Sequence, residues 1–434
     1  MKYKFSKFCL YLIDENRVVI KNTRTGAIVV MSKKTFLRIK KWIQGSESSL
    51  PQQCLANLSG ENGILVSNDL DEFEDYKKSF LFTRNKKANL FSLHFLPTTN
   101  CQFSCNYCFE KGTSKTDMNF NILGQSIKWL YQYLDINKAI DDLRLIIFGG
   151  EPLLRKDLVT TFLPEFKRLS EIYKKSFWTE LTTNGEFLNQ DVAKTLANYN
   201  WKRAQITLDG YGETHDRRRT NANRKLSFHQ IISNIKMLIE NNYIDKIDLR
   251  ISLDGETYDS IPKLIKFLGK LGWQEKIKLS LGLIVPGINV DVKKDSQKLT
   301  AERVLNVWVI AKKEGFEIPD EFMAGPWCVA IAKHSAVLQP DGTLQKCFCT
   351  VGKPEFNFNN IFSKPLSYTK DDRFEMFDRI NKCIEEECVY LPICGGGCIH
   401  DSIVAYGKVG FKRRFCQKTL LGKINLGLLK LNFR

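Results

Sequence analysis

The sequence predicts an α/β fold whose core is a parallel sheet of six strands, forming a barrel or part of one. Between residues 90 and 286, apolar segments of strand length alternate with helical patterns, which is typical of repeated βα units. The chain has 434 residues, enough for two or three domains, and 43% hydrophobic with 26% charged residues is ordinary for a globular protein. No apolar stretch approaches the ~20 residues of a membrane span. We therefore expect no membrane partner, and three units at residues 1–85, 88–290 and 291–434.

The first unit is predicted to be a small α+β domain. Strands are expected at residues 8–13, 18–21, 27–31 and 64–66. Ser32 can cap a helix with apolar residues at helical spacing, and a second short helix is expected at 52–58. Strands and helices of this size resemble a winged-helix fold. The polar runs 69–78 and 83–87 then indicate a linker.

The second unit carries the βα repeats. Candidate strands are residues 91–97, 143–148, 177–183, 203–208, 247–253 and 277–285. Candidate helices between them are residues 121–135, 157–173, 190–199, 226–241 and 258–270. Parallel strands point their carboxyl ends to one face, where such folds build active sites. A further helix near 300–315 leads into a tail in which regular secondary structure is expected to be sparse.

The thirteen cysteines are clustered along the chain. Three lie at 101–108 and eight between 328 and 416, while Cys9 and Cys54 stand apart and are expected in the core. Clustered cysteines without a signal peptide indicate metal ligation in a reducing compartment, so a cytoplasmic location is expected. Metal sites would also hold the loop-rich tail folded.

The run from Cys101 to Cys108 has the spacing CX3CX2C, with Cys105 in the middle. Three thiolates can hold three irons of a [4Fe–4S] cluster and leave the fourth iron open for a ligand that is not protein. The alternative is a zinc knuckle or a chance group of cysteines.

This triad directly follows the first predicted strand, has an aromatic residue, Tyr107, before its last cysteine, and precedes a βα series. In these respects the chain resembles the radical S-adenosylmethionine (SAM) enzymes, which implies a partial (β/α)6 TIM-like barrel. The resemblance also implies that the open iron chelates the amino and carboxylate groups of SAM. One electron from the cluster would then cleave SAM to a 5′-deoxyadenosyl radical that abstracts a hydrogen atom.

Three further segments match the family in order at successive strand ends. They are Gly149-Gly150-Glu151-Pro152, Thr182-Thr183-Asn184-Gly185, and Thr207-Leu208-Asp209-Gly210 followed by His215-Asp216 and Arg219. The resemblance implies that Gly149 and Gly150 let the backbone approach SAM and that Glu151 accepts hydrogen bonds from its ammonium. Asn184 would lie near its ribose or carboxylate, and Arg219 would supply a fork for the carboxylate. A second such segment, Ser252-Leu253-Asp254-Gly255, is interpreted as a turn.

The tail cysteines resemble the SPASM (twitch-type) extension of radical SAM enzymes, which holds two auxiliary [4Fe–4S] clusters and brings the expected total to three. The resemblance assigns the distal cluster to Cys383, Cys388, Cys394 and Cys416, and the proximal cluster to Cys328, Cys347 and Cys398. The chain departs from the pattern twice. The family's CX2C is Cys383-X4-Cys388 here, and no cysteine lies between Cys328 and Cys347. Cys349 is the available substitute; otherwise the proximal cluster has an open iron. Structural zinc is the alternative.

The net charge of +17 is spread over dispersed lysines, which favours a solvated surface over a nucleic-acid partner. The resemblance implies a maturase of ribosomally made peptides. Its N-terminal unit would hold the leader of a precursor peptide by strand addition, and the enzyme would form a side-chain cross-link (C–C, C–O or thioether). A flavodoxin- or ferredoxin-type electron donor is expected. The alternatives are an anaerobic sulfatase-maturating enzyme, which forms formylglycine, and a non-catalytic Fe–S protein.

No catalytic residue is assigned from the sequence. Asp209 is either a base or a turn residue, and His94 is expected to be packed in the first strand. His334 and His400 flank cluster cysteines and are interpreted as polar surface residues.

Overall fold

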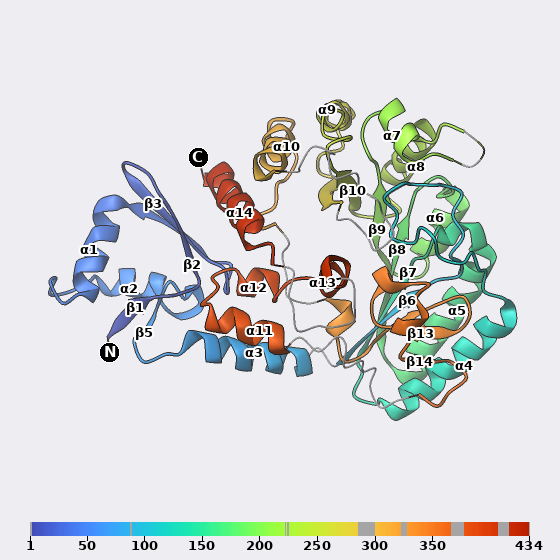
Figure 1. Ribbon diagram of the computed structural model, residues 1–434, viewed down its shortest axis with the longest axis horizontal. Helices are drawn as coiled ribbons and strands as arrows, with labels where there is room; N and C mark the ends of the chain where they lie inside the picture. The colour runs from blue at the N-terminus through green and yellow to red at the C-terminus, as the bar shows by residue number, and fades with distance from the viewer. Residues whose placement is uncertain are drawn as a thin grey trace.

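The computed structural model describes residues 2–86, 89–221, 223, 225–284, 300–322, 328–365, 377–406 and 416–433. The N-terminal unit lies at one end of the molecule and the large sheet with its helices at the other. Segments of the cysteine-rich tail lie between them (Figure 1). No helix in these ranges is long and apolar enough to cross a membrane.

The large sheet contains the six predicted strands, and all of them run parallel. They are β6 (Leu90–Phe95), β7 (Asp142–Ile147), β8 (Ser176–Thr183), β9 (Trp201–Thr207), β10 (Ile247–Leu253) and β11 (Ile277–Leu283). Their spatial order is β11-β10-β9-β8-β7-β6, with β11 at an edge of the described sheet. The predicted α/β fold with a partial barrel is confirmed.

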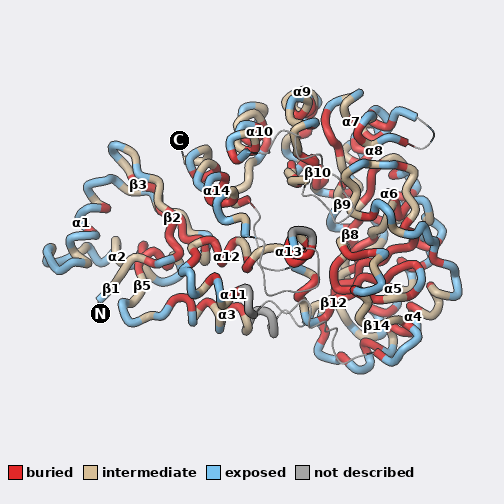
Figure 2. The backbone as a smooth tube through the Cα atoms, viewed as in Figure 1, coloured by how far each residue is buried: buried red, intermediate tan, exposed pale blue. Residues whose placement is uncertain are grey.

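The helices that follow these strands cover one face of the sheet (Figure 1). They are α4 (Phe120–Ile136), α5 (Lys156–Tyr173), α6 (Gln190–Ala197), α7 (Glu213–Arg218), α8 (Phe228–Glu240) and α9 (Ile261–Lys270). Short 3₁₀ turns occur at Gly60–Asn62, Pro152–Arg155, Val329–Ile331, Phe348–Thr350 and Pro354–Phe356. Figure 2 shows buried residues along the strands and on these helices, while strands with polar positions, such as β9 and β11, also have exposed residues.

Three short strands of the tail extend this sheet beyond β6. They are β12 (Ser335–Leu338), β13 (Thr343–Gln345) and β14 (Asn359–Asn360). β12 pairs with β6 in parallel, with Ser335 opposite Ser92, and β13 and β14 follow it in antiparallel fashion. The tail and the first barrel strand therefore share one hydrogen-bonded sheet, which the sequence did not predict.

The N-terminal unit has two small sheets and three α-helices, the last of which is α3 (Glu72–Lys86). Its other elements are β1 (Tyr3–Phe5), β2 (Cys9–Ile13), β3 (Arg17–Asn22), β4 (Ile28–Ser32), α1 (Lys33–Ile43), α2 (Gln52–Leu58) and β5 (Leu65–Ser67). β2, β3 and β4 form an antiparallel sheet in that order, and β1 pairs with β5. The Ser32 hydroxyl accepts a hydrogen bond from the Thr35 N–H at 3.0 Å, which is the expected cap of α1.

The prediction of a linker at 69–78 and 83–87 was wrong for residues 72–86, and residue 87 lies outside the described residues. Residues Glu72–Lys86 form helix α3, on which Phe73, Tyr76 and Phe80 are buried at helical spacing. The rings of Phe73 and Tyr76 pack with Phe8, with ring centroids of Phe8 and Phe73 4.7 Å apart, and Phe80 packs on Tyr76. The exposed polar residues between these aromatics hid the apolar stripe, because a linker and a half-buried helix share a similar composition.

The described tail contains five more helices. They are α10 (Ala301–Lys313), α11 (Phe377–Glu385), α12 (Leu391–Cys394), α13 (Ile399–Tyr406) and α14 (Lys418–Phe433). α10 corresponds to the helix predicted near 300–315, and it packs against α14. α11 lies beside α3 of the N-terminal unit (Figure 1).

Candidate functional site

The triad Cys101, Cys105 and Cys108 lies in the loop that follows β6. The loop turns back at its end, where the Cys108 N–H donates to the Cys105 carbonyl at 3.2 Å. The Phe103 N–H points at the Cys101 sulfur at 3.4 Å. Burial raises the pKa of Cys101 to about 12 and that of Cys108 to about 11, so thiolates here need the positive charge of bound irons.

Gly149 and Gly150 bring the end of β7 against the chain that leads into the triad. Gly149 has φ +139, and a side chain on it would collide with the Thr98 carbonyl oxygen. A Cβ on Gly150 would collide with the Asn100 carbonyl oxygen. The close approach that these glycines permit is therefore to residues 98–100, which fixes the loop just before Cys101.

Glu151 is fully buried and ties the ends of two strands together. Its carboxylate accepts hydrogen bonds from the Leu153 N–H (3.1 Å), the Thr183 hydroxyl (2.8 Å) and the Asn184 N–H (2.8 Å). Burial raises the pKa of Glu151 to about 7, while these hydrogen bonds and the charge of Arg219 oppose the rise. All three donors belong to the protein itself. Because one of them is the Asn184 N–H, Glu151 fixes the position of the backbone at Asn184.

Asn184 lies beside the triad. Its side-chain Nδ2 is 3.9 Å from the Cys101 sulfur, and its Oδ1 accepts a hydrogen bond from the Glu186 N–H at 3.0 Å. The end of β8 thus lies beside the loop after β6 that carries the triad, because the carboxyl ends of parallel strands lie on the same side of the sheet.

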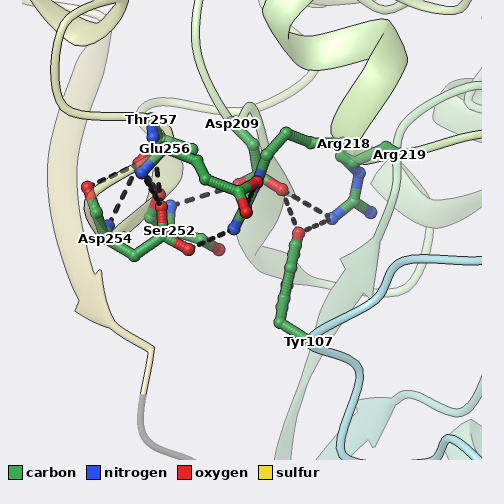
Figure 3. Close-up of polar contacts among 8 residues, drawn as sticks. All are labelled: Tyr107, Asp209, Arg218, Arg219, Ser252, Asp254, Glu256 and Thr257. Atoms are coloured by element: carbon green, nitrogen blue, oxygen red, sulfur yellow. Dashed lines mark hydrogen bonds and ion pairs between the residues drawn. The ribbon is translucent and has the colours of Figure 1, made fainter. Parts of the chain in front are cut away.

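Arg219 contacts both Asp209, which follows β9, and Tyr107, which lies in the loop that carries the triad (Figure 3). Its Nη1 donates to the Tyr107 hydroxyl at 2.7 Å and lies 3.5 Å from the Asp209 carboxylate, to which the same hydroxyl donates. Its Nε is buried and has no hydrogen-bond partner in the part of the chain that the structure describes. Asp209 is thus neither exposed nor free; it is a buried partner of Tyr107 and Arg219.

The neighbouring Arg218 is held in a different way. Its guanidinium donates to Asp254 and to Glu256, both at 2.5 Å, and lies over the Tyr107 ring at 5.1 Å. Of the segment Ser252–Gly255, predicted to be a turn, the first two residues end β10 and the turn begins at Asp254, which also accepts from the Thr257 N–H. The sequence did not predict that this turn holds Arg218 (Figure 3).

These residues fit SAM and a three-cysteine cluster. The triad supplies one thiolate for each of three irons, and Arg219 has an unpaired guanidinium edge of the kind that binds a carboxylate. Arg218 also has a buried Nε without a partner among the described residues, but both of its Nη atoms are committed to carboxylates, whereas Arg219 commits only Nη1. The structure thus separates the two adjacent arginines by what each can still bind.

The four cysteines Cys328, Cys347, Cys349 and Cys398, here called the proximal set, lie close together. Their position is set partly by Lys346, whose Nζ donates to the Ala332 carbonyl at 2.7 Å and to the Ser335 hydroxyl. The pKa of Cys349 is raised by its contact with Cys347, by burial, and by Cys398 and Cys328. All three other thiols are therefore within electrostatic reach of Cys349.

The four cysteines Cys383, Cys388, Cys394 and Cys416, here called the distal set, line a single cavity together with Tyr390 and Leu391. The lengthened Cys383-X4-Cys388 spacing forms a turn after α11, in which the Cys388 N–H donates to the Cys383 carbonyl at 2.9 Å. Glu387 closes this turn with φ +45. The extra residues thus return Cys388 to the side of Cys383.

Within the described residues, no three His, Cys, Asp or Glu side chains converge as ligands of one metal ion. A [4Fe–4S] cluster does not need such convergence, since each thiolate binds a different iron. All eleven predicted cluster cysteines thus fall into three groups, one at the strand ends and two in the tail.

Three histidine predictions can be compared with the structure. His94 is packed as predicted, with its ring stacked on Phe348 at 5.5 Å. His334 and His400 were predicted at the surface, and this was wrong because both are buried. The His334 Nδ1 lies 2.6 Å from the Tyr133 hydroxyl, a contact between distant segments that no local pattern reveals.

Comparisons with known sequences agree with this geometry. Residues 95–268 match the radical SAM superfamily. The chain is 31% identical over 181 residues to a cysteine-type anaerobic sulfatase-maturating enzyme of Clostridium novyi (strain NT), covering 40% of this chain and 46% of that protein. It is 38% identical over 112 residues to a GTP 3′,8-cyclase of Campylobacter jejuni subsp. doylei, covering 26% and 32%. The matched region thus spans less than half of these relatives.

Solved structures share the fold over longer stretches. Native anSMEcpe with bound AdoMet and Kp18Cys peptide has a TM-score of 0.61 at 15% identity, covering 79% of this chain and 98% of that one. Streptococcus suis SuiB bound to precursor peptide SuiA has a TM-score of 0.50 at 17% identity, covering 96% and 100%. The family resemblance seen in the sequence is confirmed, and the chain carries a radical SAM domain at residues 95–268.

Proposed function

We propose that this protein is a radical SAM maturase that modifies a ribosomally made precursor peptide. The observation that carries the proposal is the meeting of the cysteine triad, the glycine-lined end of β7 and the unpaired edge of Arg219 at one end of the parallel sheet. Bound SAM, cleaved by one electron from the cluster, supplies a radical that abstracts hydrogen.

The chain's own residues would orient this cofactor. The triad holds the cluster, and Arg219 binds the SAM carboxylate through its free Nε edge. Asn184, positioned by Glu151, lies on the triad side of the same site. Gly149 and Gly150 hold the loop in place.

The proximal and distal sets would each hold an auxiliary [4Fe–4S] cluster, and Cys349 would complete the proximal one. Replacing Cys349 by alanine should then change the spectrum of one auxiliary cluster and lower its iron content. The matched control is Cys54→Ala, at a half-buried cysteine of α2. An unchanged iron content and an unchanged electron paramagnetic resonance (EPR) spectrum in the Cys349 variant would exclude it as a ligand.

A peptide substrate is supported by the N-terminal unit. Strand β4 is at the edge of its sheet, Val30 on it is 48% exposed, and Lys33 and Lys34 follow it. An edge strand with free hydrogen-bonding groups can add a strand from a leader peptide. The fold likeness to SuiB extends over this unit, since it covers 96% of the chain. We therefore favour formation of a side-chain cross-link (C–C, C–O or thioether).

The second candidate is a sulfatase-maturating activity that forms formylglycine. The observation that favours it is the 31% identity to the Clostridium novyi enzyme. Both candidates need a one-electron donor of the flavodoxin or ferredoxin type. Both also need a reducing compartment, in agreement with a cytoplasmic location.

The first experiment is incubation of iron-loaded protein with SAM and dithionite, with Cys105→Ala as the control. Formation of 5′-deoxyadenosine above the control is expected, and its absence would exclude the radical SAM activity. The second experiment adds candidate precursor peptides with and without their leader. Loss of two hydrogen atoms from the core peptide without a new aldehyde indicates a cross-link. A new aldehyde that reacts with a hydrazide indicates formylglycine, formed from cysteine by loss of the sulfur and two hydrogens with gain of one oxygen, or from serine by loss of two hydrogens.

A further inference from the structure

Helix α3 of the N-terminal unit belongs to the same buried cluster as two cysteines of the distal set, Cys383 and Cys388. Phe8, Phe73 and Tyr76 pack in one hydrophobic cluster with Cys383 and Cys388. Outside this cluster, the Thr23 hydroxyl donates to the Val389 carbonyl at 2.6 Å, and Lys7 pairs with Glu387. The N-terminal unit is therefore fixed directly to the segment that carries the distal cysteines.

Tyr76 is the exceptional residue of this contact. Its side chain is buried, yet its hydroxyl has no hydrogen-bond partner in the part of the chain that the structure describes. The two other aromatics of the α3 stripe, Phe73 and Phe80, carry no polar atom. Since buried hydroxyls in proteins are nearly always paired, an acceptor for the Tyr76 hydroxyl is expected nearby.

The packing of Tyr76 indicates which acceptor it is. Its ring lies in the same hydrophobic cluster as Cys383 and Cys388. A tyrosine hydroxyl is protonated at neutral pH, so it acts as a donor toward a negatively charged neighbour. Cys383 and Cys394 also line the distal cavity, where a bound cluster would bring thiolate and sulfide acceptors.

We propose that the Tyr76 hydroxyl donates a hydrogen bond to a sulfur atom of the cluster held by the distal set, so that the N-terminal unit tunes that cluster's reduction potential. The proposal rests on the proposed auxiliary clusters. Hydrogen bonds to cluster sulfur stabilise the reduced, more negative state and so raise the potential. A unit proposed to bind the leader would then be in direct contact with the redox chemistry.

The test compares wild type with Tyr76→Phe, which removes one hydroxyl and keeps the ring packed against Phe8. Iron-loaded proteins are titrated with dithionite, and cluster reduction is followed by EPR. The distal signal is identified as the one lost in Cys383→Ala. The matched control is Tyr173→Phe, on the barrel helix α5, whose hydroxyl bonds to the Tyr131 carbonyl and to Asp135.

The expected result is a more negative midpoint potential for the distal signal alone in Tyr76→Phe. The triad signal, and every signal in the control variant, should stay at the wild-type potential. The iron-free variant should melt no lower than iron-free wild type, because the bond forms only with the cluster; a purely structural hydroxyl would lower this melting temperature. An unshifted distal potential would overturn the proposal.

A second variant tests the same bond in the opposite direction. Incorporation of 3-fluorotyrosine in place of Tyr76 makes the hydroxyl more acidic and a stronger donor, so the distal potential should become more positive. If Cys383→Ala removes neither iron nor an EPR signal, the distal cluster itself is absent and the proposed auxiliary clusters fail. If that cluster is present but insensitive to both Tyr76 variants, only the hydrogen bond is wrong.

Discussion

Two adjacent arginines are predicted to have different roles, and this can be measured with one pair of variants. The Nε of each arginine is buried without a partner among the described residues, but both Nη atoms of Arg218 bind Asp254 and Glu256. Arg219 commits only Nη1, to Tyr107 and Asp209. Replacing Arg219 by lysine keeps the positive charge and removes the planar fork. We expect this variant to lose affinity for SAM.

The size of the effect follows from the bonds lost. A hydrogen bond to a charged group contributes about 1.5–3 kcal/mol net. Lysine at 219 retains one donor and loses one arm of the fork, so we expect SAM binding to weaken by about 1.5–3 kcal/mol. That corresponds to roughly a ten- to 150-fold higher Kd.

Equilibrium binding of SAM to anaerobically loaded protein measures this change, after iron content has shown that the cluster is intact. The matched control is Arg218→Lys, which loses contacts to Asp254 and Glu256 and should lower stability with less than about a threefold change in Kd. Equal loss of SAM affinity in the two variants, or a larger loss in Arg218→Lys, would refute the assignment.

Three other predictions concern the barrel. Glu180 accepts two hydrogen bonds from Arg144, at 2.7 and 2.8 Å, and Glu180→Ala leaves that arginine, 23% exposed, without its carboxylate. We expect a loss of about 2 kcal/mol in urea unfolding, below the ~3–5 kcal/mol of a fully buried pair. Burial acts to raise the pKa of Glu180, but Arg144 outweighs it and the pKa lies below 4.5. The ionised carboxylate thus stabilises the fold above pH 4.5. This contribution is lost as the pH falls below that value, and melting curves of the alanine variant should lack it. Gly150→Ala forces a Cβ onto the Asn100 carbonyl and should cost about 1–3 kcal/mol and lower iron uptake, whereas Gly124→Ala, with open space, should be neutral or stabilising.

Much of the barrel could be predicted from the sequence because apolar residues recur regularly along its strands. In β10 and β11 they stand at alternate positions, the period of a strand, and each functional segment follows directly on a strand. The position of Glu151, Asn184 and Arg219 near the triad then followed from the common direction of parallel strands. The hydrogen bond between Arg219 and Tyr107 did not, because Tyr107 comes from another loop and shares no local pattern with Arg219.

The elements that were not predicted depend on contacts between distant segments. Helix α3 is stable because Phe73, Tyr76 and Phe80 meet Phe8 and the tail, and its polar residues alone resembled a linker. Strand β12 has four residues, too few for a periodic signal, and it exists because β6 offers it an open edge. In both cases tertiary packing outweighs local propensity.

The pairing of β6 with β12 also has a consequence for how the chain folds. β6 is made early in synthesis, but its partner on this side, residues 335–338, is made only after the rest of the barrel. Until then the strand that leads into the triad has one unpaired edge, and unpaired edges promote aggregation. Chains that end before residue 335 should therefore be poorly soluble even though they contain every barrel strand. We therefore expect iron to be loaded onto the triad with least aggregation once β12 has paired with β6. In this sense the tail takes part in the folding of the barrel's first strand.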